Sequence, residues 1–395
     1  MKSKKSMVTE LNQEIREILI EEGAEDIYKC FQCGKCTSIC PWFQIEVFDF
    51  PAYTFSLKTA MGDMAASEDK FELEAEIDMI YRCVGCEACT DQCPHGISTP
   101  NILRAARRLL VDFGSYPDTL KSVVQKIHSD ANPLGEPREK RADWANGLEI
   151  PSFSADLEFL YFTCCLTAYD PRMQKLSKAT SFLLKKAGIS FGILGEKESC
   201  CGEAIRRIGS ESIFQEVSKA NISNFENYLV KKVIVSSPHC YSTFKNEYPE
   251  FGAEIEVSHI TEILFDSIER GTIIPNKEFN KKVVYHDPCD LGRKNNIYDE
   301  PRNVLKSIPG LELLEVEDFN RNLSVCCGAG SGGLWMEWDK DERIVNVRLK
   351  QLLETGADVI AVACPYCLQM FEETLKSMNS NVLVMDVTEI LLESL

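Results

Sequence analysis

The sequence predicts a multidomain chain: an all-α N-terminal domain followed by two α/β repeats with a pseudo-two-fold relation. Two observations predict this fold class. Eight of the eighteen cysteines lie in two compact runs in the N-terminal third, and helical patterns flank both runs. In the remainder, short apolar runs alternate with helical stretches in two successive sets of three, and each set has a cysteine doublet at its centre.

Bulk composition narrows the class of protein. A length of 395 residues suits two or three domains, and a hydrophobic content of 44% suffices for buried cores. The net charge of −18, without long basic stretches, argues against nucleic acid as a partner. We see neither a signal peptide nor an apolar run of about 20 residues, so we expect no direct membrane insertion. We expect a cytoplasmic protein that reaches the inner face of a membrane only through a partner subunit.

Helices are expected on both sides of the cysteine runs. The apolar spacing over residues 8–18 predicts an amphipathic helix that ends before Gly23. After the second run, Thr99 is the expected N-cap of a helix with Pro100 at its first position and Gly114 beyond its end. Proline, glycine and charged residues then interrupt the periodicity, which predicts an interdomain linker. The expected domains are residues 1–131, a linker at 132–155, a first repeat at 156–275 and a second repeat at 276–395.

Six apolar runs predict the strands of the two repeats. They are LEFLYF, SFGILG and KKVIVSS in the first copy, and KKVVYH, LELLEV and DVIAVA in the second. Each run leads within a short distance to cysteine. The first copy has Cys164 and Cys165, then Cys200 and Cys201, then Cys240; the second has Cys289, then Cys326 and Cys327, then Cys364 and Cys367. Aligning Tyr161 with Tyr285 places Cys165 opposite Cys289.

The two N-terminal runs have the CxxCxxCxxxCP spacing of bacterial ferredoxins, in which the fourth cysteine serves the other cluster. We therefore expect two [4Fe-4S] cubanes in a crossed arrangement. One has the ligands Cys30, Cys33, Cys36 and Cys93, and the other Cys83, Cys86, Cys89 and Cys40. Zinc is the alternative, but zinc modules usually separate two CxxC pairs by a longer loop. The 42 residues between the runs exceed a compact small ferredoxin, so this part resembles the α-helical ferredoxin domains of succinate dehydrogenase-like and heterodisulfide reductase-like enzymes.

The second repeat resembles the CCG domain of heterodisulfide reductase, and the whole chain resembles the D-type subunit of that family. The resemblance implies a noncubane [4Fe-4S] cluster held by five thiolates. The matching residues are Cys289, Cys326, Cys327, Cys364 and Cys367. The first copy departs from the pattern, because Thr243 stands where a CxxC motif that begins at Cys240 would place its second cysteine. Whether its cysteines hold a further cluster, with Cys164 as a substitute ligand, or none stays open here.

Two motifs have competing interpretations. The CPYC sequence at residues 364–367 also occurs in glutaredoxins as a redox pair, but the matching doublet favours cluster ligation. Glycines after both doublets, at Gly202 and at residues 328–333, either bring backbone amides to cluster sulfurs or form tight turns. The run at residues 328–333 lacks the downstream acidic residue of a dinucleotide-binding loop, so we expect no nucleotide binding there.

Two histidines lie close to cysteines in the sequence. They are His239, directly before Cys240, and His286, three residues before Cys289. Imidazole titrates near neutral pH, so both are candidate proton donors. Hydrogen bonding to the backbone is the commoner role of such histidines.

The resemblance implies an iron–sulfur oxidoreductase. In the leading hypothesis the cubanes deliver electrons to the noncubane cluster, which reduces or forms a disulfide, small or protein-borne. The partners would be a membrane cytochrome b, a flavoprotein or another iron–sulfur subunit. The alternative is a non-catalytic electron-transfer subunit that links a dehydrogenase or reductase complex to a quinone, a cytochrome b or a flavoprotein. The chain is also similar to the iron–sulfur subunits that accompany sulfite reductase at membranes and glycerol 3-phosphate dehydrogenase.

Overall fold

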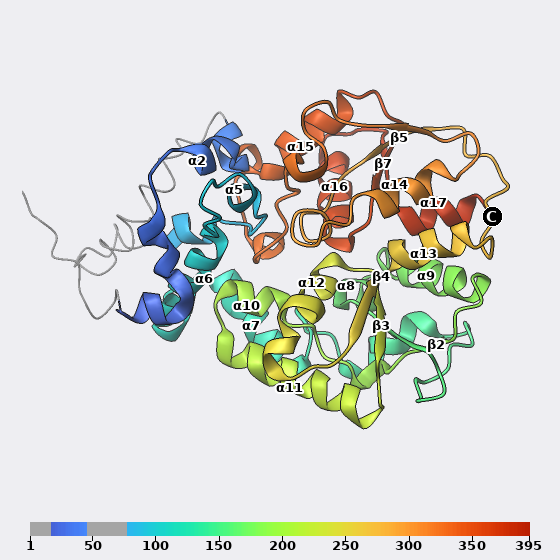
Figure 1. Cartoon of the computed structure of the whole chain (residues 1–395), viewed down its shortest axis with the longest axis horizontal. Coiled ribbons are helices and arrows are strands. Elements are labelled where there is room, and N and C mark those ends of the chain that lie inside the picture. Colours follow the sequence, from blue (N-terminus) through green and yellow to red (C-terminus); the bar gives the residue numbers. More distant parts are fainter. Residues whose placement is uncertain (1–16, 46–76) are drawn as a thin grey trace, which may run out of the picture.

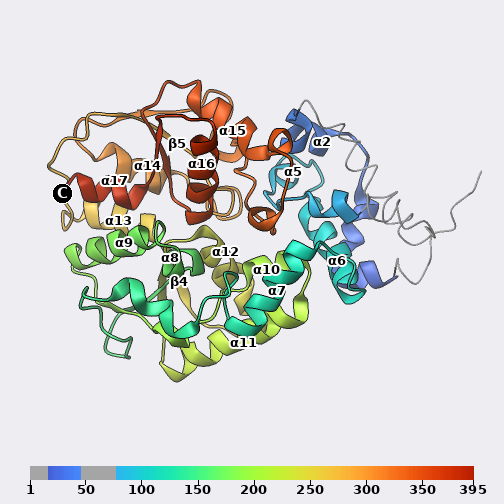
Figure 2. The same cartoon turned by 180° about the vertical axis from the view of Figure 1, so that it is seen from behind.

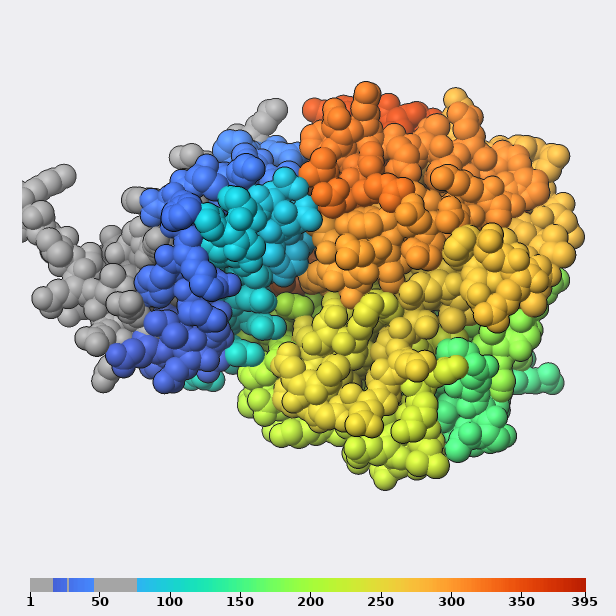
Figure 3. Space-filling model, viewed as in Figure 1, coloured from blue at the N-terminus to red at the C-terminus, as the bar shows by residue number. Residues whose placement is uncertain are grey.

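The computed structural model describes residues 17–45 and 77–395, which form three packed parts (Figure 1). Two of them are α/β lobes, each built on a four-stranded parallel sheet. The third is the N-terminal part, which lies against one side of both lobes. Views from opposite sides agree on this arrangement (Figure 2). The space-filling view shows the N-terminal part in contact with the lobe above and the lobe below (Figure 3).

Helices and turns build the described portion of the N-terminal part. Its elements are η1 (Ile20–Ala24), η2 (Glu25–Lys29), α2 (Lys35–Ile39), η3 (Pro41–Gln44), α5 (Ala88–Asp91), α6 (Thr99–Asp112) and α7 (Asp118–Asp130). Most of the helix expected over residues 8–18 lies outside the described residues, as does the segment 46–76. The all-α character of the domain therefore stays a prediction.

Helix α6 confirms the helix expected after the second cysteine run, with a shift of one residue at its start. The N-cap is Ser98 rather than Thr99, because the Ser98 hydroxyl accepts a hydrogen bond from the backbone amide of Asn101 at 3.4 Å. Pro100 lies in the first turn, where its missing N–H costs nothing. Gly114 follows the helix with φ of 69°, a conformation that glycine adopts without strain.

The first lobe contains a parallel sheet with the strand order β2-β1-β3-β4. Its strands are β1 (Phe159–Phe162), β2 (Phe191–Gly192), β3 (Lys232–Val235) and β4 (Glu256–His259). Its helices are α8 (Cys165–Tyr169), α9 (Gln174–Lys186), α10 (Glu203–Ile208), α11 (Glu211–Asn227), α12 (Pro238–Asn246) and α13 (Ile260–Glu269), with the turns η4 (Arg138–Ala145), η5 (Gly195–Lys197) and η6 (Tyr248–Phe251). Strand β1 is buried along its whole length, as expected for a parallel sheet covered on both faces.

The second lobe repeats this topology with the order β6-β5-β7-β8. Its strands are β5 (Lys282–Tyr285), β6 (Glu312–Leu314), β7 (Val359–Val362) and β8 (Leu383–Asp386). Its helices are α14 (Asp299–Lys306), α15 (Ile344–Leu353), α16 (Pro365–Ser377) and α17 (Val387–Glu393), with the turns η7 (Arg321–Leu323), η8 (Gly333–Trp335) and η9 (Lys340–Glu342). The shared strand order confirms the internal repeat, and all six predicted runs contain strands.

The fourth strand of each copy was not predicted from the sequence. Strands β4 and β8 lie at sheet edges, and their mixed exposure leaves no continuous apolar run to detect. Both strands end at a residue that caps the following helix in the same way. His259 and Asp386 are N-caps of the following helices, and each forms a capping box with a glutamate three residues later. The matched caps are further evidence that the lobes are copies of one unit.

Two arginines fix the parts to one another. The buried guanidinium of Arg107 on α6 donates to the carbonyl oxygens of Cys83 at 2.6 Å, Arg207 at 2.9 Å and Ser331 at 3.2 Å, and so joins all three parts. Arg172 of the first lobe forms ion pairs with two glutamates of the second lobe, Glu372 and Glu389, each at 2.7 Å.

Candidate functional site

The parallel strands of each lobe bring its cysteines together. Strands β1, β3, β5 and β7 each end within a few residues of a cysteine, and the doublets follow β2 and β6. Because the carboxyl ends of parallel strands meet at one edge of a sheet, side chains that follow them converge there. Each lobe therefore collects thiols that are far apart in the sequence, and all eighteen cysteines of the chain are free thiols.

The five cysteines of the second lobe, here called the second set, form a continuous buried group. The sulfur atoms of Cys289 and Cys326 are 3.9 Å apart, and those of Cys327 and Cys367 are 3.3 Å apart. Each side chain is at most 8% exposed. Thiol contacts run through the set in the order Cys289, Cys326, Cys327, Cys367 and Cys364.

The first lobe has five cysteines in the same arrangement, here called the first set. All are buried, with at most 5% exposure. Contacts run in the order Cys165, Cys200, Cys201, Cys240 and Cys164. The structure thus brings together all five cysteines that the sequence suggested as candidate ligands in this copy.

The sheet register corrects the alignment of the two sets. Tyr161 pairs with Ile234 in the first sheet, and the equivalent Tyr285 pairs with Ala361 in the second. Counting three residues on from each partner places Ser237 opposite Cys364. Cys240 then corresponds to Cys367. The residue that replaces a cysteine is therefore Ser237 and not Thr243.

The ends of the following helices support this correction. Ser237 is the N-cap of α12 and Cys364 is the N-cap of α16. A proline occupies the first position of both helices. The expectation for Thr243 was wrong because a motif counted forward from Cys240 ignores the strand register, which only the fold supplies.

Backbone amides point at the first sulfur of each doublet. The amide of Gly202 lies 3.4 Å from the Cys200 sulfur, and that of Gly328 lies 3.3 Å from the Cys326 sulfur. Both glycines have positive φ, 88° and 92°, so a turn and an amide–sulfur contact occur together. The two interpretations of these glycines are therefore not exclusive.

His239 lies beside the second set, although in the sequence it directly precedes Cys240 of the first set. Its ring contacts the Cys364 thiol, and its Nδ1 atom lies 3.2 Å from a carboxylate oxygen of Glu203 and 3.7 Å from one of Asp290. Burial alone would lower the pKa of His239, but these two carboxylates raise it well above the usual range. Burial likewise opposes ionisation of Cys364, yet hydrogen bonds with Cys367 and His239 lower the pKa of its thiol to about 6.

His286 also lies at the second set. It contacts the Cys327 thiol and accepts a hydrogen bond at Nδ1 from Arg348 at 3.2 Å. Burial lowers the pKa of this histidine. Both candidate histidines therefore face the same five thiols. Their role as proton donors stays a prediction.

The ferredoxin-type cysteines line two neighbouring cavities. The first is lined by Cys30, Cys33, Cys36, Cys89 and Cys93, and the second by Cys36, Cys40, Cys83, Cys86 and Cys89. The last cysteine of each run thus lines the cavity of the other run. Cys33 is exposed to solvent, whereas Cys86 is buried. His95 makes an edge contact with the exposed ring of Phe31 beside the first cavity.

The second cavity adjoins the second set. The thiols of Cys86 and Cys326 are in hydrogen-bonding contact although 240 residues separate them. Close backbone packing makes this approach possible, because a side chain at Gly330 would collide with the carbonyl oxygen of Val84. The glycine run at residues 328–333 therefore serves as a docking surface for the N-terminal part.

Two arginines near the thiols, Arg141 (buried) and Arg293 (partly buried), were not predicted from the sequence. Arg141 donates from Nη1 to the Cys165 sulfur at 3.4 Å and is paired with Glu198 at 3.2 Å. Arg293 donates from Nε to the carbonyl oxygen of Cys86 at 2.7 Å. Arg141 lies in the predicted linker, where no motif or periodicity marks it. Its packing shows that this segment is part of the first lobe's site.

The residues present fit iron–sulfur clusters. Groups of buried free thiols, each with nearby backbone amides and a guanidinium, suit an anionic inorganic core held by thiolates. Carboxylate-rich metal sites fit less well. Glu203, His239 and Asp290 lie close enough to share an ion, but the ammonium of Lys294 is 2.6 Å from the other carboxylate oxygen of Asp290, and its positive charge disfavours a cation there.

Comparisons with known proteins agree with this geometry. A family model for a 4Fe-4S dicluster domain matches residues 26–97, and one for a cysteine-rich domain matches residues 159–245 and 283–372. The probable iron–sulfur-binding oxidoreductase FadF of Bacillus subtilis is 34% identical over 93% of this chain, and the EtfAB:quinone oxidoreductase of Syntrophomonas wolfei is 34% identical over 93%. The chain spans 60% and 58% of the lengths of these two relatives.

A third relative matches along nearly its whole length. The D-type subunit of the dihydromethanophenazine:CoB–CoM heterodisulfide reductase of Methanosarcina barkeri is 32% identical over 93% of this chain and 93% of its own. Among residues 17–45 and 77–395, no helix is both long and apolar enough to cross a bilayer. The paired domains and the full-length match show that the chain belongs to the family of iron–sulfur proteins that resemble the D-type subunit of heterodisulfide reductase.

Proposed function

We propose that this protein carries electrons between a flavoprotein and a second redox partner through a series of iron–sulfur clusters. Two cubanes would be held by the ferredoxin-type cysteines in the crossed arrangement. A noncubane cluster would be held by the second set. When bound, these clusters supply one-electron storage and transfer. The contact between Cys86 and Cys326 carries the proposal, because it joins the ligands of a cubane to those of the second set.

The ends of this series differ in exposure. Cys33 is exposed and lies beside Phe31, whose side chain is 78% exposed, so electrons can be exchanged with a partner protein there. The second set is buried between the lobes. Arg293 and the Gly328 amide place positive charge and a hydrogen-bond donor next to its thiolates, which favours the reduced state of a bound cluster.

The identity of the electron acceptor has two candidates. The name of the Syntrophomonas relative, EtfAB:quinone oxidoreductase, supports a flavoprotein and a quinone as the two partners. Burial of the second set agrees with a conduit, since a bulky substrate has little access to the five thiols. In this reaction a quinone takes up two electrons and two protons to give the quinol.

The second candidate is reduction or formation of a disulfide at the second set. The match to the D-type subunit of heterodisulfide reductase over 93% of both chains supports it. Cleavage would consume two electrons and two protons and release two thiols. His239 and His286 both contact cysteines of the second set and would be positioned to deliver protons there.

One experiment separates the candidates. The cluster-loaded protein is reduced with an excess of reduced viologen under anaerobic conditions and mixed with a water-soluble quinone or with a panel of disulfides. Quinol formation without thiol release supports the conduit, and repeated thiol release supports the disulfide reaction. A protein that holds iron and acid-labile sulfide but is oxidised by neither acceptor would contradict both. A protein that folds without iron would contradict the clusters themselves.

A further inference from the structure

The first set lacks one thiol that the second set has. Ser237 occupies the position of Cys364, as the sheet register and the helix caps show. Its side chain is fully buried, and among the described residues its hydroxyl has no hydrogen-bond partner. If the repeat were the only source of ligands, the first set would have four cysteines.

The first set also has one thiol that the second set lacks. Aligning Tyr161 with Tyr285 places Cys164 opposite Pro288, which has no side chain able to bind a metal. Cys164 is the residue before α8 and is 4% exposed. The first copy has therefore lost a cysteine at one position and gained one at another.

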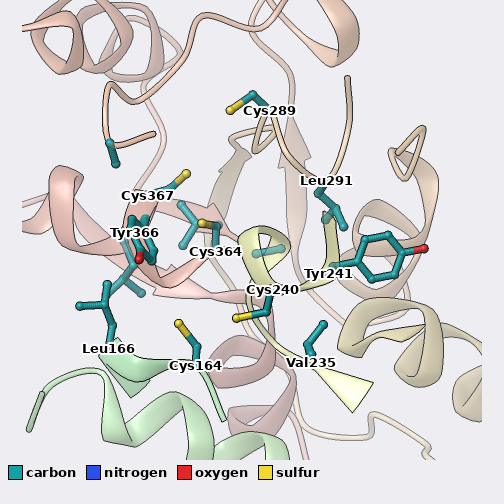
Figure 4. Close-up of a cluster of buried hydrophobic side chains, with 14 of the residues drawn as sticks. Cys164, Leu166, Val235, Cys240, Tyr241, Cys289, Leu291, Cys364, Tyr366 and Cys367 are labelled. Carbon is teal, nitrogen blue, oxygen red and sulfur yellow. The ribbon is translucent and has the colours of Figure 1, made fainter. Parts of the chain in front are cut away.

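The gained cysteine takes over the contact of the lost one. In the second set Cys364 closes the series of thiols through its contact with Cys367. In the first set Cys164 makes the corresponding contact with Cys240. Figure 4 shows the Cys164 and Cys240 side chains next to each other, below the side chains of Cys364, Cys367 and Tyr366. Two different chain positions thus make the equivalent thiol contact in the two sets.

We propose that the first set holds its own iron–sulfur cluster and that Cys164 supplies the thiolate ligand that Ser237 cannot. The inference rests on the proposed function only in assuming that the CCG lobes carry clusters. It assigns a ligand that the repeat pattern does not contain. The first cluster would then be bound by a thiolate from the end of strand β1 in place of one from the start of helix α12.

The surroundings of the first set suit a bound anionic cluster. The Arg141 guanidinium is 1% exposed and lies 3.4 Å from the Cys165 sulfur, and the Gly202 amide lies 3.4 Å from that of Cys200. Arginine is rarely buried without a reason, because desolvating the charge is costly. The Glu198 carboxylate alone would balance the charge of Arg141. The guanidinium nevertheless directs a second nitrogen, Nη1, toward the Cys165 sulfur. The simpler alternative is that Cys164 is a small buried residue that only packs.

Rescue by a moved thiol tests the proposal. Cys164→Ser should lower iron and acid-labile sulfide by about four atoms each per chain, the content of one [4Fe-4S] cluster. The double variant Cys164→Ser/Ser237→Cys rebuilds the motif of the second copy and should restore both. The matched control Cys164→Ser/Thr243→Cys adds a thiol at a buried position of α12 that lacks a counterpart in the second set, and it should not restore them.

The readouts are iron, sulfide and the paramagnetic signals of the oxidised and reduced protein, with circular dichroism to monitor folding. Full iron in Cys164→Ser, or equal rescue by Thr243→Cys, would overturn the proposal. If Cys164→Ser fails to fold, the decision passes to the two double variants. The proposal is supported if Cys164→Ser/Ser237→Cys folds with full iron and Cys164→Ser/Thr243→Cys does not. It is overturned if both double variants recover iron equally or if both fail.

A separate variant distinguishes this inference from the proposed function. Cys367→Ser removes a thiol of the second set and leaves the first set unchanged. Iron loss in Cys367→Ser, with none in Cys164→Ser, would leave the proposed function standing and remove only this inference.

Discussion

The rings of His239 and Tyr366 stack on each other with their centroids 4.3 Å apart and their planes inclined by 33°. The two residues occupy the same position in the two repeats, two residues after Ser237 and Cys364 respectively. A residue meets its own counterpart only near a two-fold axis, as the predicted pseudo-two-fold relation requires. Each ring also reaches the opposite cysteine set: His239 contacts Cys364, and the surroundings of Tyr366 include Cys164. The pair therefore connects the two sets.

Removing the imidazole of His239 should change the second cluster without removing it. His239→Gln deletes a hydrogen bond to the Cys364 sulfur, and hydrogen bonds to cluster sulfurs raise the reduction potential. We expect unchanged iron content and a potential lower by tens of millivolts, on the order of a tenfold change in the redox equilibrium. A potentiometric titration monitored by paramagnetic resonance measures this. His128→Gln, at a residue whose side chain is 61% exposed, is the control and should leave the potential unchanged.

Arg107 should be among the most sensitive residues outside the clusters. Arg107→Ala leaves buried carbonyl oxygens of all three parts without their donor, and each unsatisfied buried group costs about 1–3 kcal/mol. We expect the thermal unfolding midpoint to fall by several degrees and electron transfer from the cubanes to the second set to slow. The control is Arg270→Ala, which removes an exposed pair with Asp266 and should cost less than about 1 kcal/mol. Equal midpoints for the two variants would contradict the joining role of Arg107.

Arg293 should tune the clusters on both sides of the junction between Cys86 and Cys326. Its guanidinium lies where Cys86, Cys289 and Cys326 all act on it electrostatically. Arg293→Gln removes a partly buried positive charge, so adding an electron becomes less favourable and the potentials should fall by tens of millivolts. Arg321→Gln, at a guanidinium that is 42% exposed, should have little effect. A potential shift confined to the cubane expected on Cys30, Cys33, Cys36 and Cys93 would contradict a role of Arg293 at this junction.

The sequence predicted most strands of this chain and the grouping of its cysteines, but not the detailed geometry of the sites. Six apolar runs bounded by turn residues were sufficient for six strands, but the edge strands β4 and β8 carry no such run. The identity of the replaced ligand required strand register, because spacing alone could not distinguish a motif that starts at Cys240 from one that ends there. The sequence placed His239 directly before Cys240, but its contact with Cys364 could not be predicted, since that contact crosses between the repeats. Arg141 had no signal at all.

The pH dependence of stability should reveal the buried carboxyl of Asp386. Burial raises the pKa of this N-cap residue to about 7 from the ordinary value of 3.8. Between those two values the folded protein retains a proton that the unfolded chain has lost. The stability that Asp386 contributes is therefore complete below about pH 4 and is lost as the pH rises toward 7. Asp386→Asn keeps an acceptor for the Thr388 amide, which Asp386 binds at 2.9 Å, but cannot ionise.

The wild type should thus lose stability relative to Asp386→Asn between pH 5 and pH 8. The expected difference is on the order of a few kcal/mol, since each pKa unit corresponds to about 1.4 kcal/mol. The urea midpoints of the two cluster-loaded proteins at several pH values measure this difference in stability. Any loss of clusters in acid affects both proteins alike and cancels in the comparison. Asp118→Asn alters a carboxyl that is 94% exposed and should give a curve parallel to that of the wild type. Parallel curves for Asp386→Asn as well would mean that Asp386 is already ionised in the folded protein at pH 5.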